Sequence, residues 1–110
     1  MDYKESPEIN KKDAEAAFAS GNVKSICEAL VSISLYEKDG KWAQNKCLEF
    51  LGSENSEIKA VAVTGLGHIA RVHRQLDKEK VLAALASNQY DVAIAGQIED
   101  AIDDINMFVL

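Results

Sequence analysis

The strongest constraint in the sequence is an apolar pattern that recurs three times at a spacing of 36 residues. Each copy is a triad spaced to lie on one helix face: Ile26, Leu30, Ile33; Ala62, Leu66, Ile69; and Ile98, Ile102, Ile105. A period of this size in a helical sequence is typical of a solenoid of stacked helix pairs, which usually binds other macromolecules. We therefore predict an all-α fold, a right-handed stack of three antiparallel helix pairs, in a single domain over residues 1–110.

Capping residues and glycines divide the repeats into helices. We predict helices over residues 11–20, 23–36, 41–51 and 57–73, a short helix with Asp77 as its N-cap, and a last helix over 90–106. Residues 1–9 are predicted to form a loose lead-in. The apolar residues 107–110 are predicted to fold back over the last pair, or else to dock into a partner. Gly65 lies in mid-helix, where we expect it to let neighbouring helices approach closely.

Composition favours a globular helical protein, with 47% hydrophobic residues and a single proline. No apolar run is long enough to span a bilayer, and the first twenty residues have no apolar core of a secretion signal. We therefore expect a cytoplasmic protein without a membrane partner. In that reducing compartment Cys27 and Cys47 are predicted to be buried thiols.

Negative charge is concentrated at the C-terminal end of the chain. The net charge is -6, and residues 81–110 carry five carboxylates but no Lys or Arg. Direct binding of nucleic acid requires a basic face and is therefore not expected. A basic protein is the more plausible partner.

Sequence motifs for chemistry are lacking, so no catalytic residue, cofactor or metal ligand is predicted. His68 and His73 are five residues apart and do not share a helix face. The cysteines form no CxxC pair, and Gly65-Leu66-Gly67 lacks the pattern of a phosphate-binding loop. We therefore predict a protein that is not an enzyme.

The segment 57–70 resembles the second helix of a HEAT repeat. That family has an acidic, an apolar and a basic residue at the helix start, then alanines, Leu-Gly and a further apolar residue. The positions that match are Glu57, Ile58, Lys59, Ala62, Leu66, Gly67 and Ile69. The resemblance implies a HEAT-like α-α superhelix.

In size, acidity and three HEAT-like helix pairs, the whole chain resembles the bacterial immunity proteins of contact-dependent growth inhibition. Those proteins bind and silence a toxin domain, often a nuclease, delivered by a neighbouring cell. The resemblance implies a non-enzymatic inhibitor whose partner is a cognate toxin, with a basic nuclease domain as the expected kind. A HEAT-like scaffold or adaptor is the alternative, an enzyme-like helper is a third reading, and the oligomeric state stays open.

The predicted partner-binding residues lie opposite the apolar stripe of the second helices: Thr64, His68 and Arg71, then Asp100, Asp103 and Asp104 one period later, with Glu99 beside them. One period earlier, the same face holds Glu28 and Ser32. Carboxylates four residues apart on a helix repel each other. This local cost favours a partner that supplies positive charge, although a solvated face that confers solubility is the alternative.

Overall fold

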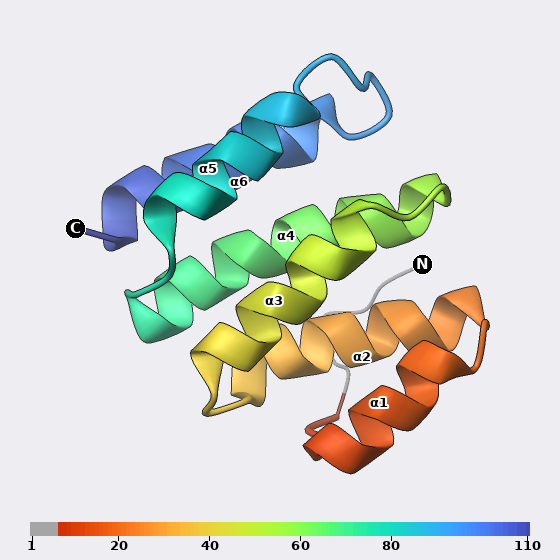
Figure 1. The fold of residues 1–110 in the computed structure, drawn as a ribbon. Helices are drawn as coiled ribbons and strands as arrows, with labels where there is room; N and C mark the ends of the chain where they lie inside the picture. Colours follow the sequence, from red (N-terminus) through yellow and green to blue (C-terminus); the bar gives the residue numbers. More distant parts are fainter. Residues whose placement is uncertain (1–6) are drawn as a thin grey trace.

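The predicted helix pairs are present in a computed structural model, which describes residues 7–110 (Figure 1). The described residues form six helices: α1 (Lys11–Ala19), α2 (Val23–Tyr36), α3 (Gly40–Leu51), α4 (Ser56–His73), α5 (Lys78–Ser87) and α6 (Ala95–Phe108). Consecutive helices form antiparallel pairs, α1 with α2, α3 with α4 and α5 with α6. The second helices α2, α4 and α6 pack side by side, so α4 is the central helix. The predicted all-α stack of three antiparallel pairs is confirmed.

Four helices start where a side chain caps them. The side chains of Asn10, Asn22, Asp39 and Asn55 each accept a hydrogen bond from the backbone N–H three residues later. Such a bond satisfies an N–H group that has no partner within the helix. The first four helices therefore begin within one residue of their predicted starts.

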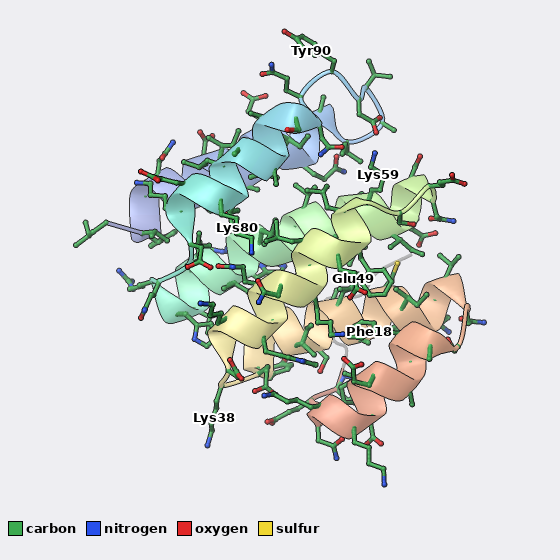
Figure 2. All side chains as sticks on the ribbon, viewed as in Figure 1. Phe18, Lys38, Glu49, Lys59, Lys80 and Tyr90 are labelled. Carbon is green, nitrogen blue, oxygen red and sulfur yellow. The ribbon has the colours of Figure 1, made fainter. Side chains whose placement is uncertain are left out.

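The predicted start of the last helix is wrong, because α6 begins at Ala95 rather than at Tyr90. Asp91 lies before this helix, where its carboxylate accepts a hydrogen bond from the N–H of Ala93 at 3.1 Å and lies 2.8 Å from Lys59 Nζ. These bonds hold residues 88–94 as a loop, from which Tyr90 projects with 88% of its surface exposed (Figure 2). The last helix also ends at Phe108 rather than at residue 106.

Asp77 occupies the N-cap position of α5 as predicted, but its side chain makes no capping bond. Its carboxylate accepts instead from the side-chain Nε2 of Gln44 at 2.9 Å, while its backbone N–H donates to the side-chain Oε1 of Gln44 at 2.7 Å. Gln44 is buried, so this pair of bonds satisfies a polar group inside the core. It fixes α3 to the start of α5.

The repeated triads form the core. Eight of their nine residues are buried, and Ile102 is half-buried. The close approach predicted at Gly65 is confirmed, because a Cβ there would lie 2.5 Å from Ser34 Oγ and 2.9 Å from Cys47 Sγ. Cys27 and Cys47 are buried as predicted, and burial raises the pKa of the Cys47 thiol to about 12.

Ile9 and Val109, near the two ends of the described residues, are each bonded to a neighbouring helix. At one end, the N–H of Ile9 donates to Ser32 Oγ at 3.1 Å, which fixes part of the predicted lead-in against α2. Residues 1–6 of that lead-in lie outside the described residues. At the other end Val109 is buried and its carbonyl accepts from Lys78 Nζ, whereas Leu110 is fully exposed. Among the described helices, none has the length and apolar character needed to cross a membrane.

Candidate protein-binding groove

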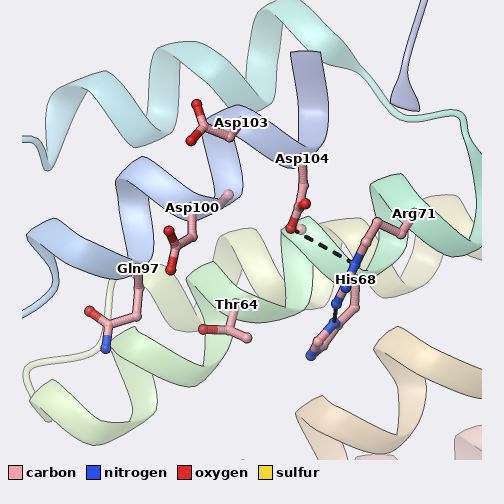
Figure 3. Close-up of a pocket in the computed structure, with 9 residues that line it drawn as sticks. Thr64, His68, Arg71, Gln97, Asp100, Asp103 and Asp104 are labelled. Atoms are coloured by element: carbon pink, nitrogen blue, oxygen red, sulfur yellow. Dashed lines mark hydrogen bonds and ion pairs between the residues drawn. The ribbon is translucent and has the colours of Figure 1, made fainter. Parts of the chain in front are cut away.

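An open groove of about 430 Å³ lies between α4 and α6 (Figure 3). Its walls are polar and come from two helices: Thr64, Gly67, His68 and Arg71 on α4, and Gln97, Asp100, Ala101, Asp103 and Asp104 on α6. Six of the seven residues predicted to bind a partner therefore lie in one groove. Residues 36 apart in sequence meet here because α4 and α6 are neighbouring second helices.

Glu99 is the predicted residue that lies outside the groove. It is exposed on α6 but does not line the groove. The groove face of α6 follows the helical spacing of residues 97, 100, 101 and 104, and Glu99 falls beside that row. The same spacing could have identified Gln97, three residues before Asp100, which the sequence reasoning missed.

Two small residues bring α4 and α6 together at the floor of the groove. A Cβ added to Gly67 would lie 3.5 Å from the Ala101 Cα and 2.9 Å from Asp104 Oδ2. The absence of a side chain at Gly67 therefore makes room for the carboxylate of Asp104. This places an acidic group of α6 directly over α4.

His68 and Arg71 form a fixed pair on the α4 wall. Arg71 Nη2 lies 2.6 Å from His68 Nδ1. Because a guanidinium group only donates hydrogen bonds, Nδ1 must accept, and the imidazole is neutral with its proton on Nε2. Burial, helped by the charge of Arg71 and opposed by Asp104, lowers the pKa of His68 below its usual value.

Charge is balanced at one part of the groove and unbalanced at another. Asp104 Oδ2 lies 3.8 Å from Arg71 Nε, so these two charges offset each other. Asp100 and Asp103 form no ion pair with any residue in the range 7–110. The groove therefore has net negative charge and can accept a cationic group.

The groove does not continue onto α2, although the repeat places Glu28 and Ser32 at equivalent positions. Ser32 is buried and bonded to Ile9, while Glu28 lies 3.9 Å from Lys24 Nζ. Within residues 7–110, no group of three or more His, Cys, Asp or Glu side chains is arranged to hold a metal ion. The groove lined by α4 and α6 thus offers carboxylates and hydrogen-bond donors at the surface.

No protein-family model and no curated protein sequence matches the chain. Among solved structures, it is similar to a chain in the crystal structure of a CDI complex from Cupriavidus taiwanensis LMG 19424. The two are 33% identical, with a TM-score of 0.88, and the match covers 100% of this chain and 99% of the other. The chain therefore belongs to the same family as this CDI-complex protein, which confirms its resemblance to the immunity proteins of contact-dependent growth inhibition.

Proposed function

We propose that the protein is a cytoplasmic immunity protein that neutralises a cognate toxin by binding it, without catalysis. The observation that carries this proposal is the similarity, over the full length of the chain, to a protein of a CDI complex. The lack of a predicted metal, cofactor or nucleophile site is consistent with action by binding alone. The proposed partner is a basic toxin domain of the nuclease type.

The α4–α6 groove is the proposed contact surface. Its unbalanced carboxylates, Asp100 and Asp103, would attract a surface rich in Lys and Arg. A nuclease needs such a surface to bind phosphates. Attraction between the two opposite charges would speed association. The bound acidic protein would then cover the basic surface and exclude the nucleic acid.

If the proposal holds, the gene immediately upstream encodes a large secreted protein, and the test uses the C-terminal domain of that protein as the toxin. Cells that produce the chain are expected to survive production of that toxin domain, and the two purified proteins are expected to form a stable complex. The affinity should fall as salt rises, because ions screen the charges that attract the partners. The absence of both rescue and binding would overturn the proposal. A stable complex with housekeeping proteins instead would favour a scaffold.

The groove is tested by reversing the two unbalanced carboxylates. Asp100→Lys with Asp103→Lys should weaken toxin binding by roughly 100-fold while the protein stays folded. The control is Glu54→Lys with Glu79→Lys, which changes the net charge equally at exposed sites outside the groove. Equal losses in both double variants would mean that only total charge matters. Glu99→Lys alone tests whether Glu99 joins the contact despite lying outside the groove.

A further inference from the structure

The α4–α6 groove is not uniformly acidic, because its two ends carry different groups. Asp100 lies beside Gln97 and Thr64 at one end, whereas His68, Arg71 and Asp104 are gathered at the other (Figure 3). We call these the carboxylate end and the donor end. Asp103 lies on the outer edge of α6, next to Asp104 in sequence.

Arg71 keeps most of its hydrogen-bonding capacity at the donor end. A guanidinium group has five N–H donors, and one of them is directed to His68 Nδ1. The 3.8 Å separation from Asp104 balances charge but is too long for a hydrogen bond. The Arg71 side chain is 47% exposed, so its remaining donors are accessible to a partner.

His68 contributes in two ways. Its Nδ1 accepts from Arg71 and so fixes the direction of the guanidinium group. With that nitrogen occupied, the neutral ring carries its proton on Nε2, which is a second donor. The donor end therefore offers hydrogen bonds to an acceptor, while Asp104 cancels the positive charge that would otherwise repel a basic toxin.

We propose that the groove binds a segment of the toxin that carries a basic side chain and a carboxylate. The basic side chain lies between Asp100 and Asp103, and the carboxylate accepts hydrogen bonds from Arg71. This inference rests on the proposed immunity function and specifies the chemistry of its partner. A partner with basic groups alone would satisfy the carboxylate end and leave the donors of Arg71 unused.

The two possibilities predict effects of opposite sign for Arg71→Gln. If a toxin carboxylate pairs with Arg71, removing the positive charge should weaken binding by roughly tenfold or more, because a charge-assisted hydrogen bond is lost. If the groove recognises only basic groups, the same substitution leaves the Asp104 carboxylate without its positive partner, so the groove becomes more negative and binding should tighten. The measurement is the dissociation constant of the upstream-encoded toxin domain by calorimetry.

Two further variants keep the result interpretable. Arg71→Lys retains the charge but not the planar fork, so it should recover part of the affinity lost in Arg71→Gln. The pair Asp100→Asn and Asp103→Asn reports on the carboxylate end alone. Weaker binding in that pair together with unchanged or tighter binding in Arg71→Gln would overturn the mixed-charge inference and leave the proposed function intact. Absence of any toxin binding by the unsubstituted protein would overturn both.

Discussion

The two sides of α4 differ in what they meet, although each presents a glycine. We call the contact between α4 and its neighbouring helices on each side a seam. Gly65 faces Ser34 of α2 and Cys47 of α3, both buried, and the seam there is closed. Gly67 faces Ala101 and Asp104 of α6, and the seam there opens into the groove. One helix therefore has a tightly packed interior on one side and a charged groove on the other.

The contrast between Gly65 and Gly67 shows that the neighbouring helix sets the role of a glycine in a helix pair. At Gly65 the atoms within reach are fixed, because Ser34 Oγ is hydrogen-bonded to the Leu30 carbonyl at 2.6 Å. At Gly67 the nearest atom belongs to the end of the Asp104 side chain, which can rotate. The first seam should resist an added methyl group and the second should yield to it.

Gly65→Ala is expected to have the largest effect on stability. Overpacking against Ser34 and Cys47 costs about 1–3 kcal/mol, and the better helix propensity of alanine returns at most about 1 kcal/mol. A net loss of about 1–2 kcal/mol should appear as a lower midpoint in thermal and urea unfolding. Unchanged stability would show that α4 can move away from α2 and α3 without penalty.

Gly67→Ala is the matched substitution on the other seam, and its stability should change by less than about 1 kcal/mol. The added methyl group would displace the Asp104 carboxylate and weaken its pairing with Arg71. Toxin affinity should therefore change, whereas the unfolding midpoint should shift less than it does in Gly65→Ala. A loss of stability as large as that of Gly65→Ala would remove the distinction between the two seams.

The smallest expected effect is a pH dependence from His68, which lies on the groove side. The pKa of His68 is lowered from 6.5 in the folded protein, so the unfolded chain binds a proton first as pH falls. Its contribution to stability is complete above pH 6.5 and decreases as pH falls from there through the lower folded pKa. Urea unfolding of the protein and of His68→Gln from about pH 8 to about pH 5 should show a steeper decline for the unsubstituted protein. Parallel curves would contradict the neutral imidazole paired with Arg71. His73 is present in both proteins, so it does not contribute to the difference between the two curves.

Much of the candidate groove followed from the repeat, because residues one period apart on adjacent second helices come together. That reasoning predicted a shared face for Thr64, His68 and Asp100, and all three line the same groove. It was less successful for the first repeat, where the bond from Ile9 buries Ser32. It also included Glu99, which lies beside the groove rather than in it.

The helices, their pairing and the buried stripes could be predicted from the sequence, because helix periodicity and capping depend on residues within a few positions of each other. The start of α6 depends on packing between distant segments, since Asp91 bonds to Lys59, which lies 32 residues away. The contacts of Arg71 with His68 and Asp104 also became visible only in the structure, as did the bond from Ile9 to Ser32 of α2. These features depend on which donors and acceptors come into contact when helices pack, and a local sequence pattern does not predict those long-range partners.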